Sequence, residues 1–201
     1  AQPIKMYYFT PVFRYENTQA GRLREHHQFG VEAFGAQKAS LDAEIIALAD
    51  SVLKAVGLNN VSLEINSIGC PVCRKRYNEI LHEYLSSRAD KLCELCNTRI
   101  QTNPLRVIDC KNPKCQEQLI EVPLIAQYLC EECAEHFEQV KKNLDILGIT
   151  YTVNERIVRG LDYYTKTVFE FIGDVGGQTL TLCGGGRYDG LIEQIGGSPT
   201  P

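Results

Sequence analysis

The sequence predicts an α+β fold in which two strand-containing parts flank a helical, cysteine-rich insertion. Segments near both ends of the chain are rich in aromatic and β-branched residues, which is typical of strands. Residues 40–57 and 134–148 instead repeat apolar residues at helical spacing. Eight of the nine cysteines gather between residues 70 and 133, which marks the middle of the chain as a separate region.

The first part begins with a predicted β-hairpin. Residues 5–15 and 27–35 have the composition of strands, and the loop between them carries arginines and a glycine at its bend. A helix is predicted over residues 40–57, from a serine N-cap to a terminating glycine. Residues 61–69 alternate as a strand, and residues 70–93 have the period of a helix of about 20 residues.

The middle of the chain is predicted to be an inserted subdomain. From residue 90 to residue 133 the periodicity breaks into short pieces, with one short helix predicted over EVPLIAQYL. Helical periodicity returns over residues 134–148, and the remaining residues carry strand signals around a Gly-Gly turn. The predicted parts are the first segment of the main domain at 1–67, the helical insertion at 68–149, and the second segment of the main domain at 150–201.

Charge and hydropathy limit the classes of function. The formal net charge is −4, so a nucleic acid would have to be held by local basic patches. No apolar run reaches the roughly 20 residues that span a membrane, and the first residues lack the zones of a signal peptide. We therefore expect a cytoplasmic protein with no membrane partner.

Four close cysteine pairs, CPVC, CELC, CKNPKC and CEEC, have spacings that suit zinc. In a reducing compartment, thiolates that hold metal are favoured over disulfides, and the alternative is that the thiols are merely buried. Because four thiolates leave no open position on Zn²⁺, we expect a structural role.

A pairing of these motifs follows from the helix predicted between Cys73 and Cys93. At about 1.5 Å per residue this helix is roughly 30 Å long, too long for its two ends to share one ion. The helix after Cys133 is expected to run back antiparallel, so that the pairs interleave. The predicted sites are Cys93, Cys96, Cys130 and Cys133 for one ion, and Cys70, Cys73, Cys110 and Cys115 for the other.

Three motifs outside the insertion suggest a ligand pocket. VFRYE followed by GRLRE places arginines at a strand end, where guanidiniums suit phosphate oxygens; a solvated hairpin tip is the alternative. In VRGLDYYTKTVFEF, Arg159 precedes Tyr163 and Tyr164. Because neighbours on a strand face opposite sides, at most one of these rings is expected to reach a ligand. The three glycines of LCGGGRYDGL indicate the close approach of another backbone or a ligand.

Taken in order, these segments resemble the signatures of the histidyl-tRNA synthetase family. FRYENTQAGRLREHHQFGVE resembles motif 2 of the class II synthetases, and RGLDYYTKTVFEF and CGGGRYDGL resemble the two histidine-binding motifs. NPLRVIDCKNP resembles part of the bacterial insertion, so the resemblance covers nearly the whole chain. It implies a catalytic domain with an antiparallel sheet flanked by helices. Such a domain condenses histidine with ATP, accompanied by Mg²⁺, and then loads histidine onto tRNA.

The resemblance also implies roles for residues that bind ATP. Arg14 is expected at the α-phosphate, Arg22 at the outer phosphates, and Arg159 at the charge that develops on the α-phosphorus. Glu16 is expected on the adenine side, and His26 stands where relatives commonly have a phenylalanine that stacks on adenine. Adenylyl transfer of this kind needs positioning and charge stabilisation rather than a general base.

For histidine, the resemblance implies a pocket built from both halves of the chain. Glu32 and Tyr164 are expected at the imidazole, Gln28 at the polar end of the amino acid, and Tyr188 along the wall. A carboxylate and a phenol can satisfy both ring nitrogens, which would reject side chains that leave them unpaired. The full predicted histidine-binding set is Gln28, Glu32, Arg159, Tyr163, Tyr164 and Tyr188.

Other features of the family have no counterpart in these residues: class II motifs 1 and 3, an upstream glutamate and the anticodon-binding domain. We therefore expect a fragment that does not aminoacylate alone, although full-length members of the family are homodimers. Basic residues of the insertion suit phosphates of the acceptor stem of tRNA(His), and solvated faces are an equal alternative. They are Arg74, Lys75, Arg76, Arg99, Arg106, Lys111 and Lys114.

Two rival functions remain open. The first is a non-enzymatic, synthetase-like regulatory subunit of ATP phosphoribosyltransferase that senses histidine; the motif 2 arginines and NPLRVIDCKNP argue against it. The second is a zinc-stabilised nucleic-acid module, which leaves the tyrosine and glycine motifs unexplained.

Overall fold

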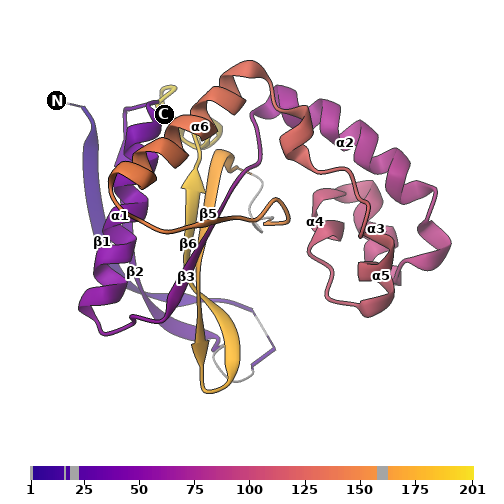
Figure 1. The fold of residues 1–201 in the computed structure, drawn as a ribbon, viewed down its shortest axis with the longest axis horizontal. Helices are drawn as coiled ribbons and strands as arrows, with labels where there is room; N and C mark the ends of the chain where they lie inside the picture. The colour runs from indigo at the N-terminus through magenta and orange to yellow at the C-terminus, as the bar shows by residue number, and fades with distance from the viewer. Residues whose placement is uncertain (1, 16, 19–22, 158–162) are drawn as a thin grey trace.

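The computed structural model describes residues 2–15, 17–18, 23–157 and 163–201 (Figure 1). Strands β1 (Ile4–Phe13) and β2 (Glu25–Phe34) pair antiparallel over their whole length, which confirms the predicted hairpin.

A second sheet carries the remaining strands in the order β4-β3-β5-β6. Its strands are β3 (Val61–Ser67), β4 (Thr152–Val153), β5 (Thr165–Val175) and β6 (Gln178–Arg187). The long strands pair antiparallel, and the two-residue β4 runs parallel to β3. The Gly-Gly turn at residues 176–177 joins β5 to β6, and both glycines have positive φ, as a tight hairpin turn requires.

Two helices cover the sheet. Helix α1 (Ala39–Ala55) begins one residue before the predicted serine cap, and Gly57 follows its end with φ of 89°. Helix α6 (Glu131–Ile146) packs against α1 and against β3 and β5 (Figure 1). Together they bury one apolar cluster, formed by Ala39, Ala43, Ile46, Leu63, Ile65, Phe137, Val140, Leu144, Phe169 and Phe171.

The insertion forms its own core on the side away from the hairpin (Figure 1). Tyr77, Leu81 and Leu85 lie on one face of α2 and are almost fully buried. The short helices beyond it divide a stretch that the sequence marked as turn-rich. The elements are α2 (Pro71–Ser86), the 3-10 helix η1 (Ala89–Lys91), α3 (Glu94–Thr102), α4 (Leu105–Ile108), α5 (Pro113–Gln118) and the 3-10 helix η2 (Ile125–Tyr128).

The packing of α6 indicates where the core of the insertion ends along the chain. Phe137, Val140 and Leu144 join the core of the sheet rather than the core of the insertion. The insertion core ends at residues 128 and 129, just before α6 begins. The domain division at residues 67 and 149 stays a prediction. Beyond β6, the described chain continues into the short helix α7 (Leu191–Gln194).

Candidate active site and cysteine clusters

One face of β2 carries the residues expected to bind histidine and adenine. Because side chains alternate along a strand, His26, Gln28 and Glu32 lie on the same face, and all three are half-buried. Gly30, between them, faces Tyr8 of β1. A Cβ at Gly30 would lie 2.1 Å from Cζ of Tyr8, so glycine lets the tyrosine ring lie across β2.

A hydrogen bond joins the two predicted halves of the histidine pocket. Tyr188 follows the last residue of β6, and its hydroxyl donates to Oε2 of Glu32 on β2. Burial raises the pKa of Tyr188, and the hydrogen bond and charge of Glu32 raise it further. The Tyr188 ring also meets Phe34 and Tyr163 edge-on, with centroids 6.3 and 6.1 Å apart. The structure therefore brings Glu32 and Tyr188 together.

The expectation that Tyr163 and Tyr164 face opposite sides is wrong. Their ring centroids lie 4.9 Å apart, and both rings pack in one cluster with Tyr188. The strand β5 begins only at Thr165, so the alternation of side chains along a strand does not apply to this pair. Tyr164 is 7% exposed, and Tyr163 is half-buried beside it.

The glycines of β6 allow a close approach of the neighbouring strand, as the sequence indicated, and also of aromatic rings. A Cβ at Gly185 would lie 2.8 Å from the Phe169 ring. At Gly186 it would lie 2.6 Å from the Thr167 carbonyl oxygen and 2.9 Å from Cδ1 of Tyr164. The close approach predicted at this motif therefore comes from the protein's own β5 and from Tyr164.

The residues expected to bind ATP are described only in part. Arg14 lies just beyond β1, is exposed, and its backbone N–H donates to the Arg24 carbonyl at 2.8 Å. Glu16, Arg22 and Arg159 lie outside the described residues. Their roles stay predictions, as do those of Arg14 and His26.

A buried ionic network beside the pocket was missed by sequence reasoning. Arg187, the last residue of β6, donates to Asp42 of α1 through Nε at 3.0 Å and Nη2 at 2.5 Å. Asp42 also accepts from Thr167 Oγ1 at 2.6 Å and lies 2.8 Å from Nε2 of His136. Arg187 reaches Asp189 at 2.7 Å as well. The network ties α1, α6, β5 and β6 together next to Tyr188.

A sequence signal for this network exists. Asp42 follows Ala39 by three residues and precedes Ile46 by four, which places a charge on the buried face of a helix. A charge at such a position needs a partner, and Arg187 closes a strand in which glycines and apolar residues otherwise dominate. Tyr8 was also missed: burial and then the charge of Glu32 raise its pKa.

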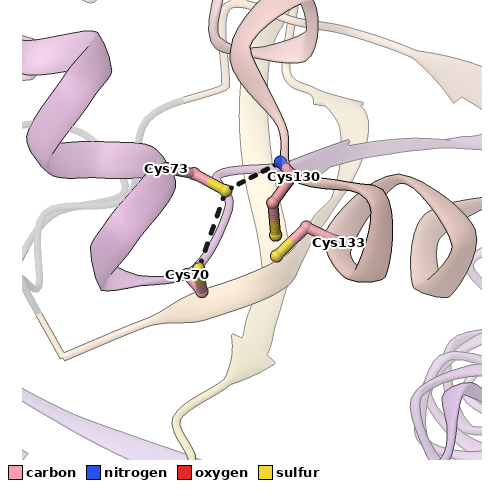
Figure 2. Close-up of side chains that lie close together, drawn as sticks. All are labelled: Cys70, Cys73, Cys130 and Cys133. Atoms are coloured by element: carbon pink, nitrogen blue, oxygen red, sulfur yellow. Dashed lines mark hydrogen bonds between the residues drawn. The ribbon is translucent and has the colours of Figure 1, made fainter.

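The eight paired cysteines form two clusters, in a pairing different from the predicted one. Within each cluster all four sulfurs lie within 4.8 Å of one another. The base cluster is Cys70, Cys73, Cys130 and Cys133, and the outer cluster is Cys93, Cys96, Cys110 and Cys115 (Figure 2 shows the base cluster).

The interleaved pairing is therefore wrong, and the course of α6 explains why. This helix packs along α1 and the sheet, not alongside α2. The insertion returns to the start of α2 through η2 before α6 begins, which brings Cys130 and Cys133 to Cys70 and Cys73. The argument that Cys73 and Cys93 cannot share an ion is confirmed, because they belong to different clusters.

Helix starts present thiols to both clusters. Cys70, Cys93 and Cys130 are the N-cap residues of α2, α3 and α6, and the second cysteine of each pair lies in the first turn. Backbone N–H groups donate to sulfur from Cys130 to Cys73 at 3.1 Å and from Cys93 to Cys115 at 3.2 Å. Helix N-termini and amide donors favour thiolates.

The pKa values of the thiols diverge within each cluster. Burial raises the pKa of Cys73, Cys96, Cys115 and Cys133. Burial also raises the pKa of Cys70, but hydrogen bonds with Cys73 and with the Val72 N–H outweigh it and lower that pKa to about 7. The Cys96 N–H likewise lowers the pKa of Cys93 to about 7.

The sulfur spacing fits a tetrahedral ion. Four sulfurs about 2.3 Å from Zn²⁺ stand roughly 3.8 Å apart. Sγ of Cys70 lies 3.6 Å from that of Cys73, and Sγ of Cys93 lies 4.0 Å from that of Cys110. These distances, and the 4.8 Å within which all four sulfurs of each cluster lie, suit one metal ion per cluster. The ninth cysteine, Cys183, lies on β6, apart from both clusters.

Comparison with known proteins decides the family. The model of the histidyl-tRNA synthetase family matches residues 1–201. This chain belongs to the histidyl-tRNA synthetase family. The histidine–tRNA ligase of Caldanaerobacter subterraneus subsp. tengcongensis is 61% identical over 201 residues, which cover all of this chain and 48% of that protein. The chain spans about half the length of the curated relatives it matches.

Solved structures confirm the class II synthetase-like fold. Apo histidyl-tRNA synthetase of S. aureus is 41% identical with a TM-score of 0.77, covering all of this chain and 47% of that one. A Bacillus halodurans protein, described as an ATP phosphoribosyltransferase regulatory subunit/histidyl-tRNA synthetase, has a TM-score of 0.61 at 23% identity. The match covers all of this chain and 55% of the Bacillus halodurans chain, and at this identity it shows the fold alone. Within the described ranges, every helix is too short or too polar to span a lipid bilayer.

Proposed function

We propose that this chain forms part of a histidine–tRNA ligase, which activates histidine with ATP and Mg²⁺ to histidyl-adenylate and transfers it to tRNA(His). The observation that carries the proposal is the Tyr188–Glu32 hydrogen bond beside Tyr163 and Tyr164. A carboxylate and phenols meet there on a half-buried surface. Their donors and acceptors can satisfy the two ring nitrogens of an imidazole.

Each pocket residue has a role in this proposal. Glu32 accepts from one imidazole nitrogen and Tyr164 meets the other, while Gln28 lies four residues nearer the hairpin loop on the same face of β2. We assign His26, further along that face, to adenine, which is part of the adenylate. Arg14 and the undescribed Arg22 and Arg159 supply positive charge for the phosphates.

The proposal is tested by calorimetric titration of a non-hydrolysable histidyl-adenylate analogue into the 201-residue chain. Glu32→Gln keeps the shape of the side chain but removes its charge, and should weaken binding about 10- to 100-fold, the value of a hydrogen bond to a charged group. Glu25→Gln is the matched control, because Glu25 is exposed and lies on the opposite face of β2.

A second arm measures activity. The chain replaces the matching 201 residues of the Caldanaerobacter subterraneus relative, and histidine-dependent exchange of pyrophosphate into ATP is measured. Exchange that Glu32→Gln suppresses supports an adenylating enzyme. A folded chimera that binds histidine without any exchange would favour the histidine sensor instead.

We further infer that each cysteine cluster holds a structural Zn²⁺. The sulfur spacing and the amide donors to Cys73 and Cys115 support this assignment. Metal analysis after purification without chelator should find two zinc ions per chain, and one in Cys93→Ser. Fewer than one ion in the wild-type chain would contradict the assignment.

The proposals for tRNA binding and dimerisation rest on membership of the family. Contact of the insertion with the acceptor stem is supported by exposed Lys75, Arg76, Lys111 and Lys114, which lie at or near the starts of α2 and α5. Lys111 is paired with Asp109 at 2.6 Å, so it reaches a phosphate only by exchanging partners. Dimerisation and a cytoplasmic location stay predictions.

A further inference from the structure

We infer that the metal of the base cluster holds the start of β5, and through it Tyr164, in the geometry of the histidine pocket; the inference rests on the function proposed above. The outer cluster has no such connection among the described residues, because its cysteines pack within the insertion core. The two clusters would then differ in role: the base cluster supports the active site, and the outer cluster supports the insertion.

The first link is the backbone between the base cluster and β5. Gly69 immediately precedes Cys70, and its carbonyl accepts from the Lys166 N–H at 2.9 Å. The Ile68 N–H donates to the Lys166 carbonyl at 2.8 Å, which extends the β3–β5 pairing to the edge of the cluster. The Thr165 hydroxyl also reaches the Gly69 carbonyl, at 3.4 Å.

Lys166 connects to the other half of the cluster as well. Its Nζ forms an ion pair at 2.7 Å with Glu132, which lies between Cys130 and Cys133. Lys166 has φ of 55°, a left-handed conformation that costs a non-glycine residue about 1 to 2 kcal/mol. Such a conformation persists where surrounding contacts fix it. Here the contacts come from Ile68 and Gly69, which precede Cys70, and from Glu132, which lies between Cys130 and Cys133.

Gly69 is enclosed by Cys73 of one cysteine pair and by Leu129, the residue just before Cys130 of the other. It has φ of 66°, and a Cβ there would lie 2.6 Å from Cβ of Cys73 and 3.2 Å from Cδ2 of Leu129. Movement of either cysteine pair would therefore displace the carbonyl that holds Lys166.

The last link leads to the pocket. Tyr164 is two residues before Lys166 and shares a buried cluster with Ile68, and Tyr163 and Tyr188 pack against this cluster. An ion that ties Cys70 and Cys73 to Cys130 and Cys133 fixes the chain next to both Ile68 and Tyr164. Without the ion, the first residues of β5 lose the support that orders Tyr164.

The test compares two matched variants of the 201-residue chain, Cys70→Ser and Cys93→Ser. Each cysteine is a half-buried helix N-cap in a CxxC pair, and serine is itself a good N-cap. After dialysis against a zinc chelator of moderate affinity, each variant should retain one zinc. Amide hydrogen exchange at Ile68 and Lys166 should then be about tenfold faster in Cys70→Ser and unchanged in Cys93→Ser, as expected for local opening.

A ligand readout accompanies the exchange measurement. The dissociation constant of the histidyl-adenylate analogue should rise several-fold in Cys70→Ser only. In the Cys93→Ser chain, stripping the remaining zinc should speed exchange at Lys166, and adding Zn²⁺ should reverse it. This arm does not depend on Cys70→Ser folding.

The outcomes separate this inference from the proposed function. Loss of the base-cluster zinc with unchanged exchange at Ile68 and Lys166 would overturn the inference while leaving analogue binding by the wild-type chain intact. Equal acceleration in both variants would overturn it too. If the wild-type chain binds no analogue, the proposed function fails, and the exchange comparison still decides the role of the metal.

Discussion

At the residue scale, the hydrogen bond from Tyr188 to Glu32 is the contact that joins the two halves of the pocket. Tyr188→Phe removes the hydroxyl and keeps the ring, including its edge contact with Tyr163. Glu32 then loses its donor, and we expect the histidyl-adenylate analogue to bind about tenfold more weakly, as for a lost hydrogen bond to a charged group. Calorimetry measures this change. Tyr7 lies on the face of the hairpin opposite to Tyr8 and Glu32, so the control variant Tyr7→Phe should bind the analogue like the wild-type chain.

Loss of the buried Asp42 carboxylate should cost more stability than loss of an exposed one. Removing one partner of a buried ion pair costs about 3 kcal/mol or more, because the other charge stays buried. We therefore expect Asp42→Asn to lower the free energy of unfolding by about that amount in urea titrations. Asp50→Asn, on the same helix and paired with Lys54 one turn away, should change it by less than about 0.5 kcal/mol.

The same carboxylate predicts an acid dependence. Burial raises the pKa of Asp42, but hydrogen bonds from His136 and Arg187 outweigh it, so the folded-state pKa lies below the ordinary 3.8. A lowered pKa means that the charged form stabilises the fold above about pH 4, and that this stabilisation is lost as the pH falls through the folded-state pKa. The stability difference between wild type and Asp42→Asn should shrink in that range; a difference independent of pH down to 2 would contradict this origin.

At the element scale, the close approach of β5 to β6 predicts the effect of filling a glycine. Gly186→Ala would place a Cβ 2.6 Å from the Thr167 carbonyl oxygen, which belongs to a paired strand and cannot move freely. We expect a loss of about 2 kcal/mol in unfolding free energy, typical of overpacking, together with weaker analogue binding because Tyr164 is displaced. At Gly190 a Cβ would meet no heavy atom within 4 Å among the described residues beyond its two chain neighbours, so Gly190→Ala serves as the control. Equal stability of the two variants would refute the packing argument.

Strand alternation could be predicted from the sequence on β2 but not before β5. Residues 25–34 alternate regularly, so His26, Gln28 and Glu32 fall on one face as expected. Tyr163 and Tyr164 carry the same strand-like composition, yet they precede the first paired residue. Composition places a residue near a strand to within a few positions, and a shift of one position exchanges the two faces. The relation between the two rings therefore required the structure.

The pairing of the cysteines could not be predicted from the sequence for a different reason. CxxC spacing identifies the ligands, because it is local. The pairing depends on where α6 packs. From the sequence alone, the apolar face of α6 could pack against either α2 or the sheet. Phe137, Val140 and Leu144 pack into the core of α1 and the sheet, so tertiary packing decides which pairs share an ion.

At the scale of the whole molecule, two separate cores differ in their dependence on metal. Cys96, Cys110 and Cys115 are part of the insertion core, whereas the core beneath α1 and α6 contains none of the eight paired cysteines among its buried residues. The α+β class and the central insertion were predictable, because both follow from local periodicity and cysteine spacing. The division of burial between the cores was not, because it depends on long-range contacts.

This division predicts a selective response to chelation. Zinc binding contributes roughly 10 kcal/mol per site in peptides that fold around zinc, so a small core built on a cluster should not survive the loss of its ion. When a strong chelator removes both ions, amides of residues 94–118 should exchange at nearly unprotected rates, while those of Ile65 and Phe169 in the sheet stay protected. Cys183→Ser should show the same zinc content and the same pattern as wild type, because Cys183 belongs to neither cluster. Simultaneous exposure of both cores would mean that the sheet depends on the insertion for its stability.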